Sequence, residues 1–228
     1  MNRIKNIIFD LGGVLLDLDV HRCLERLEGI GLHEVRQWMT GTNEKGFFKE
    51  YECGTLTTEQ FRDRIREEVG RELPDEEIDR IWNSMLKEIP DYKFELLLKL
   101  KENYNLYLLS NSNDLHWKEC AGKFTYKGMP MLDCFTQVFL SYRMHLAKPD
   151  VEIFQTVLKE AGLKADEVLF IDDSEENCQA AAKLGIGVCH YVPGDNLEVQ
   201  LQKFIVYLKS ATPFPKCYLH KEKWTFDS

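Results

Sequence analysis

The sequence predicts an α/β fold in which helices cover both faces of a parallel sheet and an all-helical domain is inserted after the first strand. Two observations support this prediction. In the second half of the chain, short apolar segments alternate with helical segments, a pattern typical of a parallel sheet. Between the first apolar segment and residue 91, by contrast, the sequence contains helical patterns and no convincing strand.

The expected strands are short, apolar and bounded by polar or turn-forming residues, as buried parallel strands are. The first covers residues 4–9 and stops at Asp10. The others are expected at residues 105–109, 137–140, 168–171 and 186–191. The helices between them are expected at residues 91–103, 150–162 and 174–184. The order of these segments places consecutive strands parallel to one another, with helical crossovers between them.

Residues 17–90 are expected to form a helical cap domain. The clearest helices in this segment are predicted at residues 57–70 and 74–89, each with a capping residue or a proline at its start. Residues 1–16 and 91–210 would then form the catalytic core, and residues 211–228 an irregular C-terminal tail. Three residues of the cap are candidates for contact with a substrate: Glu44, Lys45 and Tyr51.

Composition and charge narrow the class of protein. The formal net charge of −9 argues against a protein that binds the nucleic-acid backbone. The seven cysteines form no metal-binding pair, which favours reduced thiols and a cytoplasmic protein. We expect no signal peptide and no membrane partner, because no apolar stretch approaches the roughly 20 residues needed to cross a bilayer. These features leave the oligomeric state open.

Polar residues follow each of the first four predicted strands. Asp10 follows the first strand and Ser110-Asn111 the second. The loop after the third strand reaches Lys148, and Asp172-Asp173 follows the fourth. Because ligands bind at the carboxyl ends of strands in open parallel sheets, we expect these side chains to form one site.

The residue types in this predicted site suit phosphate chemistry. A phosphate monoester is a dianion and repels an attacking carboxylate, so the site needs a divalent cation, fixed positive charge and hydrogen-bond donors. Magnesium prefers oxygen ligands, which the aspartates can supply. Ser110 and the Asn111 amide can donate to phosphate oxygens, and Lys148 can neutralise charge. The sequence therefore favours a Mg²⁺ site that handles a phosphate group.

Four sequence segments together resemble a known family. FDLGGVLLD, LLSNSN, AKPD and FIDDSEEN are similar to the four ordered motifs of the haloacid dehalogenase superfamily, and the helical insertion resembles its C1 cap. The resemblance implies a Rossmann-like core and a Mg²⁺-dependent phosphatase that acts on small phosphorylated metabolites. The FDLGGVL form is most similar to the branch that contains bacterial sugar-1-phosphate phosphatases.

The resemblance also implies a role for each motif residue. Asp10 would be the nucleophile and form an aspartyl-phosphate, while Lys148 would stabilise the developing charge. Ser110 and Asn111 would bind the phosphate group. The implied magnesium ligands are Asp10, Asp173, the backbone carbonyl of Gly12 and Asp172, the last of these as a ligand or as a neighbour of one.

One position departs from the family pattern. Gly12 stands where the family commonly has a second aspartate that protonates the leaving group, and loss of such an acid typically costs on the order of 10²–10⁴ in rate. Either the substrate has a good leaving group, such as an anomeric oxygen or an acyl phosphate, or Asp172 or His145 donates the proton. A catalytically silent protein that binds a phosphorylated ligand is an alternative. A 2-haloacid dehalogenase is another, against which the adjacent acids Asp172-Asp173 argue.

Overall fold

A computed structural model describes residues 4–36 and 46–202 of the chain. Its centre is a five-stranded sheet with the strand order β5-β2-β1-β6-β7, in which every neighbouring pair is parallel. The strands are β1 (Asn6–Phe9), β2 (Asn105–Ser110), β5 (Gln137–Leu140), β6 (Val168–Asp172) and β7 (Gly187–His190). The five predicted strands and the predicted fold class are confirmed.

The register of the sheet brings the ends of three strands to the same level. Phe9 pairs with Leu108 of β2 on one side and with Ile171 of β6 on the other. The backbone N–H of Asp10 donates to the carbonyl of Ile171 at 2.9 Å. Because β1 lies in the middle of the sheet, the residue that follows it is flanked by the last residues of β2 and β6.

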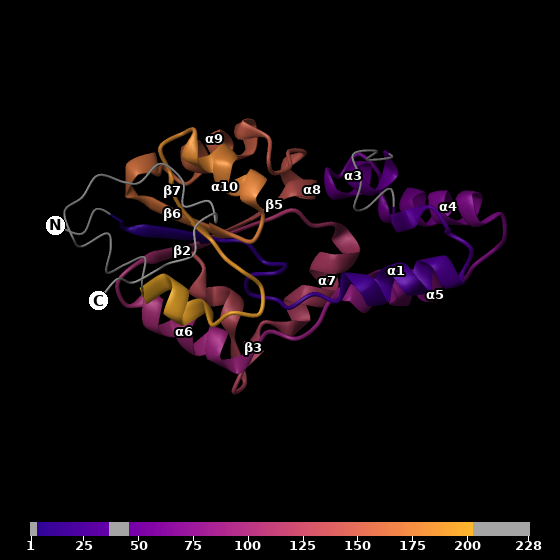
Figure 1. Ribbon diagram of the computed structural model, residues 1–228, viewed down its shortest axis with the longest axis horizontal. Helices are drawn as coiled ribbons and strands as arrows, with labels where there is room; N and C mark the ends of the chain where they lie inside the picture. Colours follow the sequence, from indigo (N-terminus) through magenta and orange to yellow (C-terminus); the bar gives the residue numbers. More distant parts are fainter. Residues whose placement is uncertain (1–3, 37–45, 203–228) are drawn as a thin grey trace, which may run out of the picture.

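Helices cover both faces of the sheet (Figure 1). Ile8 points to the face covered by α9 (Val151–Glu160) and α10 (Glu175–Ala182), where it packs in one apolar cluster. Ile7 and Phe9 point to the opposite face and pack with residues of α6 (Asp91–Lys101). The remaining elements of the core are α7 (Asp114–Lys123), the hairpin of β3 (Thr125–Tyr126) and β4 (Met129–Pro130), and α8 (Ser141–Met144), with short 3₁₀ turns at η2 (Met131–Cys134) and η3 (Ala165–Glu167).

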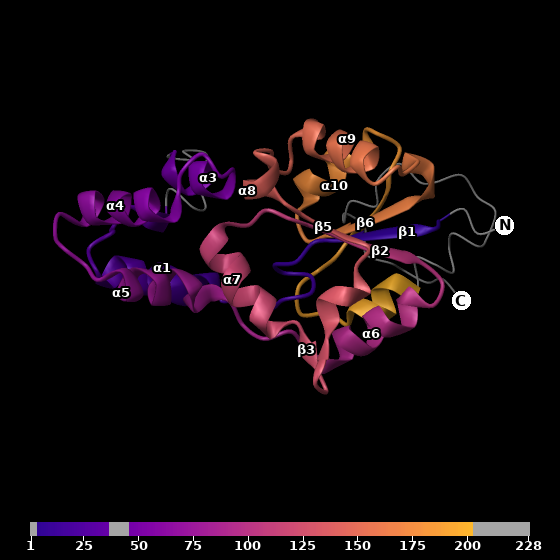
Figure 2. The same ribbon diagram turned by 180° about the vertical axis from the view of Figure 1, so that it is seen from behind.

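A second group of helices lies beyond the carboxyl ends of the strands (Figures 1 and 2). It contains α1 (Val20–Gly29), α3 (Phe47–Glu52), α4 (Thr58–Val69) and α5 (Asp75–Trp82), followed by the 3₁₀ turn η1 (Asn83–Met85). These helices share an apolar cluster of their own, in which the rings of Phe48, Phe61 and Trp82 pack together. We refer to this group as the cap helices.

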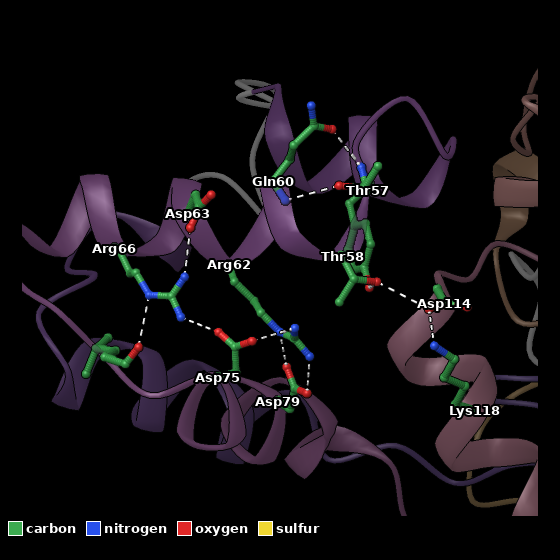
Figure 3. Close-up of polar contacts among 12 residues, drawn as sticks. Thr57, Thr58, Gln60, Arg62, Asp63, Arg66, Asp75, Asp79, Asp114 and Lys118 are labelled. Atoms are coloured by element: carbon green, nitrogen blue, oxygen red, sulfur yellow. Dashed lines mark hydrogen bonds and ion pairs between the residues drawn. The ribbon is translucent and has the colours of Figure 1, made fainter.

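An arginine network joins two of the cap helices (Figure 3). Arg62 of α4 forms a bidentate contact with Asp79 of α5, at 2.8 and 2.6 Å, and a third bond to Asp75 at 2.8 Å. Arg66 contacts Asp75 and Asp63 and donates to the Leu73 carbonyl at 2.9 Å. Helix α4 itself begins with a capping box formed by Thr57 and Gln60.

The predicted helix at residues 74–89 is too long. Helix α5 ends at Trp82, and after the 3₁₀ turn the chain becomes extended. The reason is a contact between two segments that are far apart in the sequence. The chain that returns from the cap helices pairs with the chain that leaves β1. The Lys87 N–H donates to the Asp17 carbonyl at 2.9 Å, and the Asp19 N–H donates to the Met85 carbonyl at 2.7 Å.

Three further observations bear on the expectations from the sequence. Among the described residues, no helix is both long and apolar enough to cross a membrane. Six cysteines are free thiols in the described part of the chain, namely Cys23, Cys53, Cys120, Cys134, Cys178 and Cys189. The expected C-terminal tail at residues 211–228 lies outside the described residues, as do Glu44 and Lys45.

Candidate active site

Asp10 is the first residue after β1 and lies almost fully buried at the carboxyl end of the sheet. Its Oδ1 accepts the N–H of Leu11 at 2.7 Å and lies 2.8 Å from Nζ of Lys148. The Leu11 carbonyl in turn accepts from the N–H groups of Leu15 and Leu16, at 2.9 and 2.8 Å. This tight turn leads the chain away from the sheet directly after Asp10 and fixes the direction in which the chain leaves.

Lys148 is buried between two carboxylates. Its Nζ lies 2.8 Å from Oδ1 of Asp10 and 2.6 Å from Oδ2 of Asp172, and its side chain is 1% exposed. The side chain of Asn111 holds the backbone of this lysine: Nδ2 donates to the Lys148 carbonyl at 2.8 Å, and Oδ1 accepts the Lys148 N–H at 2.9 Å. The Asn111 side chain is therefore engaged by the Lys148 backbone.

Asp172 is fully buried and surrounded by donors. Its Oδ1 accepts the N–H of Ser174 at 2.8 Å and the side-chain amide of Asn177 at 2.9 Å, while Oδ2 faces Lys148. Ser174 is also the N-cap of α10. Asn177 belongs to the FIDDSEEN segment, yet no role was predicted for it, because its reach back to Asp172 depends on how α10 begins.

Asp173 approaches the backbone of the first loop. Gly13 has a φ of +78°, and a Cβ added there would overlap the Asp173 carboxylate. Glycine is therefore required at this position both by the backbone conformation and by the space. Oxygens of Asp10, Asp172 and Asp173 all lie within 4.8 Å of one another. The four-part polar cluster expected from the sequence is thus brought together.

The charges of the site are not balanced by the protein. Burial raises the pKa of Asp10 from its ordinary value of 3.8 to about 7, and the charges of Asp172 and Asp173 add to the effect despite Lys148. Burial, followed by the charge of Asp172, also raises the pKa of Asp173. Burial alone would lower the pKa of Lys148, but the two adjacent carboxylates outweigh it and raise that pKa. One ammonium among three carboxylates leaves an excess of negative charge, which an oxygen-bound divalent cation would offset.

The remaining predicted residues are placed as follows. Ser110 ends β2 and is buried, with Oγ 3.2 Å from the Asn111 carbonyl. Nδ1 of His145 faces the Cys53 carbonyl at 3.1 Å, so the histidine contacts the cap helices. Tyr51 is buried in the apolar cluster of the cap helices, and its hydroxyl accepts the Leu115 N–H at 3.2 Å. A Cβ added at Gly12 would lie 3.0 Å from Cδ1 of Leu18, so an apolar side chain borders the position of the missing acid.

The chain as a whole is similar to several known proteins. The chain is 34% identical over 184 residues to a D-ribitol-5-phosphate phosphatase of Bacteroides thetaiotaomicron, an alignment that covers 80% of this chain and 89% of that protein. A solved HAD family enzyme of the same organism, a wild-type protein in complex with magnesium and inorganic phosphate, is 44% identical and superposes with a TM-score of 0.79. That match covers 85% of this chain and 96% of the other.

A second solved structure, a predicted HAD-like family hydrolase from Porphyromonas gingivalis, is 30% identical with a TM-score of 0.82, over 89% of this chain and 98% of that one. The family model of the haloacid dehalogenase-like hydrolases matches residues 4–185. This match contains β1, the cap helices and every predicted residue of the site. The chain belongs to the haloacid dehalogenase-like hydrolase family.

Proposed function

We propose that this protein is a Mg²⁺-dependent phosphatase of small phosphorylated metabolites, with sugar or polyol phosphates as its substrate class. The observation that carries the proposal is the buried Asp10 carboxylate, which is paired with Lys148 and surrounded by two more aspartates. The relative that acts on D-ribitol 5-phosphate by name supports the substrate class. The solved relative with bound magnesium and phosphate supports the metal and the group that is transferred.

Asp10 acts as the nucleophile in this proposal. Its Oδ1 is engaged by Leu11 and Lys148, which leaves Oδ2 to attack phosphorus. The new bond joins Oδ2 to phosphorus, the bond from phosphorus to the leaving oxygen breaks, and that oxygen takes a proton from solvent. Water then hydrolyses the aspartyl-phosphate, which releases phosphate and regenerates Asp10. Lys148 stabilises the negative charge on the phosphoryl oxygens, while the Ser110 hydroxyl and the Asn111 N–H donate to them.

The metal site is proposed from the same cluster. Asp10, Asp173 and the Gly12 carbonyl would hold Mg²⁺, which supplies charge neutralisation for the dianionic substrate. Asp172 fits a different role better. Because its two oxygens already face Lys148, Ser174 and Asn177, we assign it to the orientation of the lysine and of the loop beside Asp173.

The cap is proposed to comprise residues 17–90, with the core at residues 1–16 and 91–210. The pairing of the two connecting segments, residues 17–19 with 85–88, supports this division. The cap helices then lie over the carboxyl ends of the strands and can limit the size of the substrate (Figure 1). A cytoplasmic location remains part of the proposal and is supported by the free thiols of the described residues.

A dehalogenase fits the site less well. The excess of negative charge at the buried Asp10 and Asp172 and the partly buried Asp173 calls for a cation, whereas haloacid dehalogenation needs none. The glycine at position 12 bears instead on the choice of phosphorylated substrate. With Leu18 beside it, no acid from this position reaches the leaving group, so substrates with good leaving groups should turn over fastest.

The test is phosphate release from a panel of sugar phosphates, polyol phosphates, an acyl phosphate and an activated aryl phosphate. Wild type and Asp10→Asn are compared with Mg²⁺ and with a chelator. We expect activity that requires Mg²⁺ and falls by at least about 10³-fold in Asp10→Asn. Activity that survives both the chelator and the substitution would refute the mechanism. Tight binding of Mg²⁺ and phosphate without turnover of any compound would favour the silent binding protein.

A further inference from the structure

The hydroxyl of Ser141 joins the loop after β2 to the cap helices. Ser141 is the first residue of α8, directly after β5, and is completely buried. Its Oγ accepts the N–H of Ser112 at 2.9 Å. The same oxygen lies 2.6 Å from the carbonyl of Glu52, the last residue of α3, and 3.0 Å from the carbonyl of Ser112. One buried side chain thus contacts both the core and the cap.

This arrangement makes two hydrogen bonds compete for one proton. A serine hydroxyl carries a single hydrogen, so it donates fully to only one carbonyl at a time. The shorter distance favours Glu52 while the cap is docked. If α3 moves away, the proton is released to the Ser112 carbonyl. The bonding of Ser112 therefore depends on the position of the cap.

Neighbouring contacts show that α3 is docked closely at this point. A Cβ added at Gly54, which has a φ of +68°, would overlap the Tyr142 carbonyl, so the two backbones touch. Nδ1 of His145 faces the Cys53 carbonyl at 3.1 Å. Three consecutive cap residues, from 52 to 54, thus contact α8 or His145, the residue that follows it. Figure 2 shows α3 and α8 next to each other at this junction.

The loop that Ser141 contacts belongs to the site. Ser112 follows Ser110 and Asn111, whose hydroxyl and N–H are the proposed phosphate donors. The Asn111 side chain binds both backbone groups of Lys148, so the loops after β2 and β5 are tied together twice. Ser112 directly follows Asn111, so a shift of the Ser112 backbone occurs next to the groups that are proposed to bind phosphate.

We propose that Ser141 is a positioning residue that couples the docking of the cap to the placement of the phosphate-binding loop. The inference rests on the proposed function of that loop. In the docked state the hydroxyl holds Ser112 by its N–H and α3 by its last carbonyl. Loop geometry and cap position are thereby set by the same atom.

The first test is the kinetics of Ser141→Ala. We expect kcat to fall about tenfold while KM changes less than about threefold, because contacts to phosphoryl oxygens strengthen as charge develops in the transition state. The matched control is Thr58→Val, which keeps the size of the side chain but removes the bond between Thr58 and Asp114 at 3.3 Å (Figure 3), together with the contact of Thr58 with the Tyr51 hydroxyl at 3.0 Å. The bond to Asp114 also joins the cap to the core, at α7, and leaves Ser112 untouched. Its kcat should stay within about twofold of wild type.

The second test is amide hydrogen exchange of the metal-free protein, which needs no turnover. Ser141→Ala should raise exchange in residues 50–54 and 110–114 together, whereas Thr58→Val should leave residues 110–113 protected. Wild-type kcat in Ser141→Ala, or an equal loss in Thr58→Val, would overturn the proposal. If wild type releases no phosphate from any substrate, the proposed function fails, and the exchange pattern alone decides the coupling.

A third variant covers the case in which Ser141→Ala does not fold. Ser141→Thr retains the hydroxyl oxygen. A folded Ser141→Thr with near wild-type kcat and exchange supports the proposal, and a folded Ser141→Thr with a tenfold lower kcat contradicts it.

Discussion

Two networks of charged residues in this molecule contain similar side chains but differ in their exposure to water and in their charge balance. In the cap helices, Arg62 and Arg66 face the carboxylates of Asp63, Asp75 and Asp79 (Figure 3). In the candidate active site, one lysine faces Asp10 and Asp172, with Asp173 close by. The first network is partly exposed and the second is buried. Water therefore screens the charges in the cap, whereas the site is left with a charge that the protein does not balance.

The comparison teaches that burial, more than the number of ion pairs, marks the functional site. Asp75 pairs with both arginines, yet about half of its side chain is exposed. Asp10 is nearly inaccessible and burial raises its pKa to about 7. A perturbed carboxylate at the end of a central strand is a candidate for chemistry, whereas a partly exposed arginine network contributes modestly to stability.

The largest expected difference between the two networks follows from removal of Lys148, the positive charge of the candidate active site. Lys148→Met removes the partner of two buried carboxylates and should lower the free energy of unfolding by about 3–5 kcal/mol at pH 8 in the presence of a chelator. Arg62→Met, in the cap, should cost no more than about 1–2 kcal/mol. Urea denaturation of both variants measures the difference. Equal costs would mean that burial does not distinguish the two networks.

A second pair of variants compares glycines of the two regions. Gly13 and Gly70 have φ values of +78° and +71°, so alanine meets the same backbone penalty at both, about 1–2 kcal/mol. Nothing lies within 4 Å of a Cβ at Gly70, whereas a Cβ at Gly13 overlaps the Asp173 carboxylate. Gly13→Ala should therefore cost about 1–3 kcal/mol more than Gly70→Ala.

The affinity for Mg²⁺ should also differ between these two glycine variants. Gly13→Ala should weaken Mg²⁺ binding at least about tenfold, because the carboxylate of Asp173, a proposed ligand, must shift, and Gly70→Ala should leave the affinity unchanged. Titration calorimetry measures both affinities. A wild-type affinity in Gly13→Ala would show that Asp173 is not held against this loop by the metal site.

The pH dependence of stability offers a further contrast between the two regions. Because the native pKa of Asp10 is raised from 3.8 to about 7, the native state holds a proton that the unfolded chain has lost. The metal-free protein should thus lose stability as pH rises from about 4 to about 7, by on the order of 10 °C in Tm, because the change in pKa from 3.8 to about 7 corresponds to roughly 4 kcal/mol. Asp10→Asn should flatten this slope, and Arg62→Met should not. A slope that survives Asp10→Asn would assign the titration to another group.

The sequence predicted the sheet because buried parallel strands are apolar throughout and stand out from their surroundings. The strand at residues 137–140 was placed without error, and that at residues 105–109 to within one residue. The hairpin at Thr125–Pro130 was missed because its strands have two residues each and the left-handed turn uses Lys127-Gly128, a weak turn signal. Helix α5 was overextended because its end is set by pairing with residues 17–19.

In the site, the residue types were predictable and their partners were not. Asp10, Lys148 and Asp173 were identified from their places after strands. The engagement of the Asn111 side chain by Lys148 depends on two loops 37 residues apart. Ser141 carries no sequence signal at all, since a serine after a strand is common at any helix start. Such bonds arise from tertiary packing, which residue spacing does not encode.

The most direct test of the central claim is Mg²⁺ binding to metal-free wild type and Asp173→Asn at pH 8. If a cation completes the buried carboxylate cluster, Mg²⁺ at 100 times its Kd should stabilise wild type by about 2.7 kcal/mol, and Asp173→Asn should bind at least about tenfold more weakly. The predicted result is stabilisation of wild type that falls to about 1.4 kcal/mol or less in Asp173→Asn at the same Mg²⁺ concentration. Equal stabilisation of both proteins, or none of wild type, would contradict the account.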